Sequence, residues 1–107
     1  MDNSLLFVYR IQPTRTEMLE EGPTAQEEVI IDQHFDHLQS LTEQGTVLLA
    51  GRTLITGLDS FGIIIFRAAS ADQAQAIVDN DPAVRMGVMR AELYPFRISL
   101  AGEIERR

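Results

Sequence analysis

Two histidines, His34 and His37, lie three residues apart in the segment VIIDQHFDHLQSL, which spans residues 29–41. An imidazole titrates close to neutral pH, so it can act as a general acid or base, and it is also a common metal ligand. The chain has no cysteine, which excludes disulfides, thiolate nucleophiles and thiolate metal sites. The histidines are therefore metal ligands, acid/base groups or ordinary polar residues, and the elements that position them decide which.

Both histidines fall inside one predicted helix. The segment TAQE, from Thr24 to Glu27, matches a capping box, in which the threonine hydroxyl and the glutamate carboxylate satisfy free backbone N–H groups at a helix start. The helix should run to about Gln44, and Gly45 suits the left-handed conformation that ends many helices.

His34 and His37 occupy different positions on this helix. At 100° per residue, His34 lies within an apolar arc and should point at the protein interior. His37 lies at the margin of the arc, beside Gln33 and Gln44, and should be partly exposed. His34 is then either a structural residue bonded to a backbone carbonyl or an acid/base group oriented by a carboxylate. The apolar residues of the arc are Ile30, Ile31, Phe35, Leu38 and Leu41.

A metal site at the histidines is disfavoured. Asp32 and Asp36 are close in sequence, but they fall on a different face of the helix from His34. The chain offers no third histidine and no cysteine to complete a closed site. We therefore expect no metal ion. The sequence has no glycine-rich phosphate loop and no nucleophile elbow, so we also expect no cofactor.

Composition limits the classes to which the protein can belong. Its 107 residues suffice for a single domain, predicted as residues 1–107. The net charge is -7 and the nine basic residues are scattered arginines, which disfavours nucleic acid or an anionic membrane as a partner. The segment MDNSLLFVYRIQP begins with an acid and its apolar run is short, unlike a signal peptide or a membrane span, so we expect a cytoplasmic location.

The order of the predicted elements is strand, helix, strand, strand, helix, strand. This order indicates an α+β fold, the split βαβ sandwich of ferredoxin-like domains, with a four-stranded antiparallel sheet and the helices on one face. Short helical turns are predicted at 17–21 and 82–85, and Pro95 indicates that the last strand lies at a sheet edge or contains a bulge. The strands are predicted at 5–11, 46–56, 60–69 and 88–100, and the longer helices at 24–44 and 70–78.

Two of the strands are apolar at consecutive positions, which indicates burial on both faces of the sheet. These runs are LLFV, residues 5–8, and GIIIF, residues 62–66. Two helices cover only one face, so a second copy of the sheet is the expected cover. We predict a homodimer packed sheet to sheet, which could assemble further; the alternative is a monomer in which these residues stay half-exposed.

An ordered series of motifs runs from the histidine helix to the last strand. A histidine is followed eleven residues later by a glycine and then by a strand ending AGR, in HFDHLQSLTEQGTVLLAGR, residues 34–52. The series continues in GIIIFRAASADQAQAIVDNDPAVRMGVMRAELYPF, residues 62–96. Over roughly residues 5–100 the chain resembles the YCII-related (YciI-like) family of small dimeric α/β-barrel proteins.

The resemblance implies a ferredoxin-like fold, dimerisation, and a histidine and an aspartate that form a catalytic pair in a pocket. These two residues fall on His34 and Asp81. Some members of the family eliminate halide from chlorinated aromatic compounds. The resemblance therefore implies proton-transfer chemistry without naming a substrate.

Asp81 also has a structural interpretation. An aspartate followed by a proline, here Pro82, is a preferred N-cap and first position of a short helix. The two roles are compatible if one carboxylate oxygen caps the helix while the other holds the imidazole. An aspartate that accepts from one ring nitrogen fixes the tautomer and raises the basicity of the other, which favours proton abstraction by His34.

Arg52, in the strand after the histidine helix, is the candidate substrate-binding residue. Its guanidinium could hold a substrate carboxylate or enolate through two hydrogen bonds, or it could be a surface cation paired with one of the many acids. Tyr9 and Tyr94 fit core or interface aromatics better than catalytic acids.

Two functions follow from these residues. The first is a cofactor-independent lyase or isomerase in which His34 moves a proton on a small, anionic or cyclic substrate, for example in dehalogenation or enol chemistry, while Asp81 orients it. The second is a non-catalytic module that binds a small metabolite in the same pocket, or an accessory subunit. A cofactor-free monooxygenase would fit the fold as well, but no residue selects it.

Overall fold

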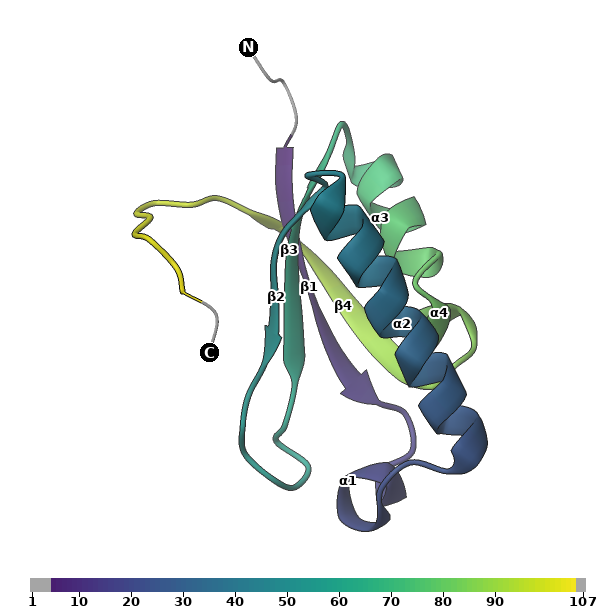
Figure 1. Ribbon diagram of the computed structural model, residues 1–107. Helices are drawn as coiled ribbons and strands as arrows, with labels where there is room; N and C mark the ends of the chain where they lie inside the picture. The colour runs from purple at the N-terminus through teal and green to yellow at the C-terminus, as the bar shows by residue number, and fades with distance from the viewer. Residues whose placement is uncertain (1–4, 106–107) are drawn as a thin grey trace.

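The computed structural model describes residues 5–105, so the ends of the predicted domain, residues 1–4 and 106–107, lie outside the described part. One sheet is packed against two longer helices, and two short helices complete the chain (Figure 1). The elements are β1 (Leu5–Pro13), α1 (Glu17–Glu21), α2 (Ala25–Glu43), β2 (Val47–Arg52), β3 (Gly62–Ala68), α3 (Ala71–Asp79), α4 (Pro82–Arg85) and β4 (Met89–Phe96).

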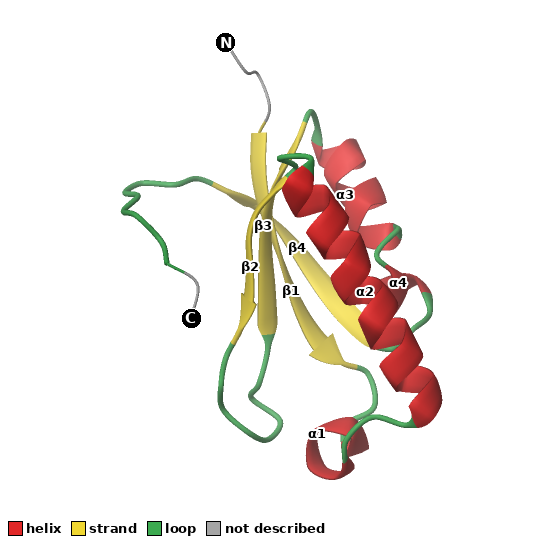
Figure 2. Cartoon of the chain, in the orientation of Figure 1, coloured by secondary structure: helices red, strands yellow, loops and turns green. Residues whose placement is uncertain are grey.

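The sheet has the strand order β2-β3-β1-β4, and every neighbouring pair is antiparallel. Both longer helices, α2 and α3, lie on the same side of it, as the red and yellow layers of Figure 2 show. The predicted α+β ferredoxin-like fold is therefore confirmed. Within residues 5–105, no helix combines the length and the apolar character needed to cross a membrane.

The start and end of α2 follow the predicted local signals. The Thr24 hydroxyl accepts a hydrogen bond from Glu27 N at 3.2 Å, and the Glu27 carboxylate accepts from Thr24 N at 2.8 Å. Gly45 adopts the left-handed conformation with φ 81° just after the helix. These local contacts fix where α2 begins and ends.

The core lies between the sheet and the helices. Side chains of a strand alternate between the two faces of the sheet, so every second residue of β1 and β3 points at α2 and α3. The Tyr9 ring packs edge-on against Phe66, with 5.6 Å between the ring centroids. The buried residues of this cluster are Phe7, Tyr9, Ile11, Leu38, Val47, Ile64, Phe66, Ala68, Ala74 and Val78.

The opposite face of the sheet, called here the open face, has no helix against it (Figure 1). Leu6, Val8, Ile63 and Ile65 point to this side and are half-buried. The apolar runs in β1 and β3 therefore contribute side chains to both faces of the sheet. The open face is partly exposed in the single chain.

Three strands are shorter than predicted, and the third of the chain covers 62–68 instead of 60–69. The second strand ends at Arg52 instead of residue 56, because Thr53 N donates to Phe61 O at 2.9 Å and closes a loop, residues 53–61. The last strand ends at Phe96 instead of residue 100. Pro95 does lie on an edge strand, as predicted, since β4 is outermost in the sheet.

Candidate active site

His34 lies on the inner face of α2 and is 9% exposed. Its Nδ1 atom is 2.6 Å from Asp81 Oδ1. The two residues are 47 positions apart in the chain, and the turn between α3 and α4 brings the carboxylate to the imidazole. The structure thus places together the two side chains that the family resemblance implied as a pair.

Asp81 is fully buried and precedes α4, where its Oδ1 accepts a hydrogen bond from Ala83 N at 3.0 Å. It is therefore the N-cap of α4 and the partner of His34 at once. The expected division of these two roles between the two carboxylate oxygens is wrong, because both contacts are made by Oδ1. The reason is that the other oxygen, Oδ2, already accepts a hydrogen bond from Tyr9.

The Tyr9 hydroxyl donates to Asp81 Oδ2 at 2.7 Å. Tyr9 is 1% exposed, so it is a core aromatic as predicted, but sequence reasoning missed its polar contact. A buried phenol needs a hydrogen-bond partner, and the position of Tyr9 on the helix-facing side of β1 was the signal that could have indicated one. Three separate segments, β1, α2 and the α3–α4 turn, therefore meet at one carboxylate.

The charges of this cluster are set by burial and by hydrogen bonds. Burial disfavours the charged form of Asp81, but the hydrogen bond to His34, the charge of that ring whenever it is protonated, and the hydrogen bonds from Tyr9 and Ala83 N hold the pKa of this carboxyl below its usual value. Burial, with the adjacent negative charge of Asp81 and the hydrogen bond to it, raises the pKa of Tyr9. Asp81 is thus an ionised acceptor and Tyr9 a neutral donor. The hydrogen-bond network then assigns the proton of a neutral imidazole to Nδ1, which leaves Nε2 as the basic nitrogen.

His34 lines a cavity of about 640 Å³ between α2 and the sheet. The residues that line it come from all four strands, from α1, α2 and the segment between these two helices, and from the 53–61 loop. Three of them carry polar side chains: His34, Arg52 and Ser60. The other walls are apolar, for example at Met18, Ile31 and Ile64. A cavity of this kind suits a small, largely apolar ligand that is oriented by a few polar groups.

Arg52 reaches the same cavity from the end of β2. Its guanidinium makes no hydrogen bond and no ion pair with any residue between 5 and 105. Arg52 is therefore not a surface cation paired with an acid of the described residues. Ser60 was missed by the sequence reasoning, because it enters the cavity only through the path of the 53–61 loop.

The long segment between β1 and α2 closes one end of the cavity with Met18, Leu19 and Pro23. An ion pair anchors this segment, since Arg15 Nη2 lies 2.7 Å from Glu27 Oε1 and Arg15 Nε lies 3.0 Å from Glu27 Oε2. The hydrogen bonds from Arg15, with the capping bond to Thr24, lower the pKa of Glu27 to about 2. The segment between β1 and α2 is thus tied to the first turn of α2.

The expected exposure was correct for His37 and wrong for Phe35. His37 is half-buried, as predicted, and its Nε2 is buried without a hydrogen-bond partner within residues 5–105. Phe35 was expected to pack in the core, but 65% of it is exposed and it lies at the cavity instead. The reason is that the sheet beneath this part of α2 is separated from the helix by the cavity.

Among residues 5–105, no group of three His, Asp or Glu side chains could hold a metal ion.

The fold and the site define a small ferredoxin-like α+β protein with a buried His–Asp pair at an apolar cavity. The family model of the YCII-related domain matches residues 6–97, and the chain belongs to this family. No curated protein matches the sequence.

Two solved structures share the fold. One is 5-chloro-2-hydroxyhydroquinone dehydrochlorinase (TftG) from Burkholderia phenoliruptrix AC1100 in complex with 2,5-dihydroxybenzoquinone, with 23% identity and a TM-score of 0.60 over 87% of this chain and 94% of that one. The other is an uncharacterized protein from Thermotoga maritima, with 11% identity and a TM-score of 0.54 over 88% of this chain and 99% of that one. At these identities the likeness is one of fold.

Proposed function

We propose that the protein is a cofactor-independent enzyme that moves a proton on a small substrate, with His34 as the general base. The observation that carries this proposal is the 2.6 Å contact between His34 Nδ1 and Asp81 Oδ1, made by a ring that lines a cavity of about 640 Å³. Because Asp81 holds Nδ1, Nε2 remains to accept a proton from a ligand in the cavity. A positioned base of this kind contributes about 10²- to 10⁴-fold to a rate.

The substrate is a small cyclic compound that carries an ionised oxygen. The apolar walls favour a ring, and the guanidinium of Arg52 at the same cavity, which has no partner in the described part of the chain, favours an anion. This cation stands out in a chain with a net charge of -7. The solved dehydrochlorinase of the same fold was crystallised with a dihydroxybenzoquinone, and a hydroxylated or quinonoid ring fits the polar groups present here.

The reaction is an elimination or an isomerisation. In an elimination, His34 Nε2 takes a proton from the substrate, the electron pair of the broken bond forms a new double bond, and the leaving group departs with its own bonding pair. In an isomerisation, the imidazolium returns the proton to another atom of the same substrate. Asp81 stabilises the imidazolium in both cases, and its lowered pKa keeps it from taking the proton itself.

The alternative is a module that binds a small metabolite without converting it. The observation in its favour is that His34 is the only acid/base group among the residues that line the cavity, since Arg52 and Ser60 are the other polar ones. Elimination needs no second acid when the leaving group is a stable anion such as halide, so we place catalysis first.

The two functions can be separated with one panel of chlorinated and unchlorinated hydroxyhydroquinones. Halide release and absorbance changes are measured for the wild-type protein, the His34→Asn variant and the Asp79→Asn variant, whose change is on the exposed end of α3. The proposal of an enzyme is supported if turnover is lost in the His34→Asn variant and kept in the Asp79→Asn variant. Binding of a panel member by the wild-type protein without any conversion supports the module instead.

We also propose that the protein is a homodimer in which the open faces of two sheets pack together. The support is the half-buried row of Leu6, Val8, Ile63 and Ile65, which lies opposite the helices. Sedimentation of the wild-type protein tests the assembly, because a mass of one chain at micromolar concentration contradicts it.

A further inference from the structure

Gln12 is a buried polar residue near the end of β1. Side chains alternate along a strand, so Gln12 points to the open face, whereas Ile11 points at the helices. Gln12 is nevertheless only 8% exposed, because the 53–61 loop covers it. Its Nε2 donates hydrogen bonds to Leu58 O at 3.3 Å and to Ser60 O at 3.2 Å. The amide group of Gln12 therefore joins this loop to the sheet.

The oxygen of the same amide is held by two arginines. Gln12 Oε1 accepts from Arg90 Nη2 at 2.6 Å and from Arg10 Nη1 at 3.2 Å. Guanidinium groups can only donate and carbonyl oxygens can only accept, so these partners allow a single orientation of the amide. The two halves of the Gln12 side chain thus have separate tasks, since the oxygen binds the strands and the nitrogen binds the loop.

A second contact from β1 reaches the same end of the loop. The guanidinium carbon of Arg10 lies 4.6 Å from the centroid of the Phe61 ring, a position in which the face of the ring attracts a cation. Glu92 on β4 orients this guanidinium, with 3.2 Å between Arg10 Nη1 and Glu92 Oε1. The end of the loop is therefore held at Leu58, Ser60 and Phe61.

Apolar packing contributes little to the position of the loop. Three of its large apolar side chains are exposed, Leu54 by 90%, Ile55 by 53% and Leu58 by 60%. The backbone hydrogen bonds from Thr53 N to Phe61 O at 2.9 Å and from Ser60 N to Gly57 O at 3.2 Å join parts of the loop to one another. The bonds from Gln12 are different, because they join the loop to the sheet.

The held end of the loop belongs to the active-site cavity. Ser60 and Phe61 both line this cavity, together with His34. Arg52 lies on the neighbouring strand, because the register of β2 and β3 pairs Arg52 with Gly62. Figure 1 shows the loop reaching beyond the ends of β2 and β3, at the end of the molecule where α1 lies. The part of the loop that β1 holds is therefore one wall of the cavity.

We propose that Gln12 is a positioning residue of the active site. It acts through the 53–61 loop and fixes the Ser60 hydroxyl and the Phe61 ring in the cavity wall beside Arg52. The residues that line the cavity do not include Gln12, so its effect is on how tightly a ligand binds and not on the proton transfer. The effect on a substrate rests on the proposed function, whereas the position of the loop does not.

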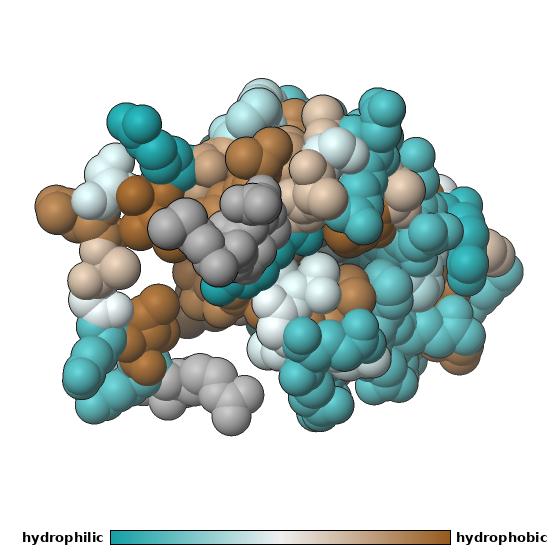
Figure 3. Space-filling view, turned by 90° about the horizontal axis from the view of Figure 1, so that it is seen from above, coloured by the Kyte–Doolittle hydropathy of each residue, from teal (hydrophilic) through white to brown (hydrophobic). Residues whose placement is uncertain are grey.

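The variant Gln12→Glu tests the position of the loop without any substrate. Its carboxylate still accepts from Arg10 and Arg90, but it cannot donate to the two loop carbonyls. Amide hydrogen exchange followed by mass spectrometry should be faster by at least about tenfold in residues 53–61, with exchange in β1 and β3 unchanged. The matched control is Gln39→Glu, the same change at an exposed position of α2. Figure 3 shows mostly hydrophilic residues over the helices, so this control should alter no segment.

Kinetics with a member of the hydroxyhydroquinone panel then separates positioning from a purely structural role. Gln12→Glu should raise KM by about tenfold and leave kcat within about threefold, because the contact between His34 and Asp81 is not changed. Lower stability alone would reduce the amount of active protein and leave KM unchanged. Gln12→Met, which has a similar size and removes all the hydrogen bonds of the amide, provides the same test if the glutamate variant does not fold.

Two results would overturn the proposal. One is unchanged exchange in residues 53–61, and the other is faster exchange in this segment with the KM of the wild-type protein. If the wild-type protein converts no member of the panel, the catalytic proposal alone is contradicted. The exchange experiment then still decides whether Gln12 holds the wall of the cavity in place.

Discussion

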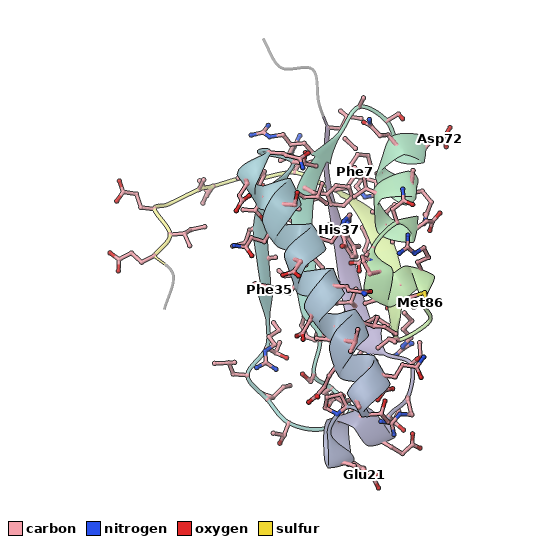
Figure 4. All side chains as sticks on the ribbon, turned by 45° about the vertical axis from the view of Figure 1, so that its right-hand side comes forward. Phe7, Glu21, Phe35, His37, Asp72 and Met86 are labelled. Carbon is pink, nitrogen blue, oxygen red and sulfur yellow. The ribbon has the colours of Figure 1, made fainter. Side chains whose placement is uncertain are left out.

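His34 and His37 lie one turn apart on α2, yet their surroundings give them different chemistry. His34 meets the Asp81 carboxylate at 2.6 Å and lines the cavity. His37 leaves the helix on the side opposite Phe35 (Figure 4), and its Nε2 is buried without a partner among the described residues. The cavity-lining residues include Phe35 and not His37.

The difference lies in what the rest of the chain supplies to each ring. An imidazole becomes a directed base when an ionised carboxylate fixes one nitrogen and a ligand can reach the other. Asp81 supplies the first condition to His34 and the cavity supplies the second. The same residue type three positions later has neither, so residue type and helix position alone do not define the site.

The largest expected effect separates the two histidines directly. His34→Asn should lower kcat by about 10²- to 10⁴-fold, because it removes the proposed base, whereas His37→Asn should leave kcat within about twofold. The measurement is turnover of the substrate found with the hydroxyhydroquinone panel, with circular dichroism to confirm that both variants fold. Equal losses in the two variants would show that neither ring acts as the base.

Next in size is the change at the carboxylate. Asp81→Asn should lower the free energy of unfolding by about 2–4 kcal/mol, since it weakens hydrogen bonds from His34 and Tyr9 to a buried charge. It should also lower kcat by about 10²-fold or more, because the tautomer of His34 is no longer fixed. Urea unfolding checks the first expectation. Asp79→Asn, at an exposed position on α3, is the control and should stay within about 0.5 kcal/mol of the wild-type value.

A smaller effect is expected at the third member of the cluster. Tyr9→Phe keeps the ring packed against Phe66 but leaves Asp81 Oδ2 without its donor, which should cost about 1.5–3 kcal/mol of unfolding free energy. Tyr94→Phe removes a hydroxyl whose bond to Glu92 is exposed, and its cost should be below about 0.5 kcal/mol. Similar costs for the two variants would mean that the Tyr9 hydroxyl contributes no more than a surface group.

The smallest expected effect concerns the segment that closes one end of the cavity. Glu27 has a pKa of about 2 in the folded chain, below its ordinary value of 4.5, chiefly because of Arg15. A carboxyl with a lowered folded-state pKa contributes stability that is complete above about 4.5 and is lost as the pH falls towards 2. Glu27→Gln should therefore flatten the loss of stability between pH 4.5 and 2, measured by urea unfolding at several pH values. Glu28→Gln, its exposed neighbour, provides the control, and an identical change in both variants would count against the Arg15 pair.

Several features of the site were predictable because their signals are local. The capping box of Thr24 and Glu27 set the start of α2, and the period of its apolar residues turned His34 inward. Asp81 before Pro82 indicated a helix cap, which it is. Each of these signals acts over a few residues, through hydrogen bonds or side chains on neighbouring turns.

Other features depended on contacts between distant segments. Tyr9 and Asp81 are 72 positions apart, and nothing near either residue in the sequence indicates that they meet. The exposure of Phe35 at the cavity and the entry of Ser60 into it follow from the space left between α2 and the sheet and from the path of the 53–61 loop.

The sequence by itself determined the elements and their order, because periodicity, capping and turn residues act within short stretches of chain, and the family resemblance added the pairing of His34 with Asp81. Only the tertiary structure decided that His34 and Asp81 touch, that Tyr9 completes their contacts, and that Arg52 lies at the cavity beside them without a partner among residues 5–105. The physical reason is that these contacts depend on how the strands align with one another and on how closely the helices approach the sheet, and both are set by packing over the whole fold.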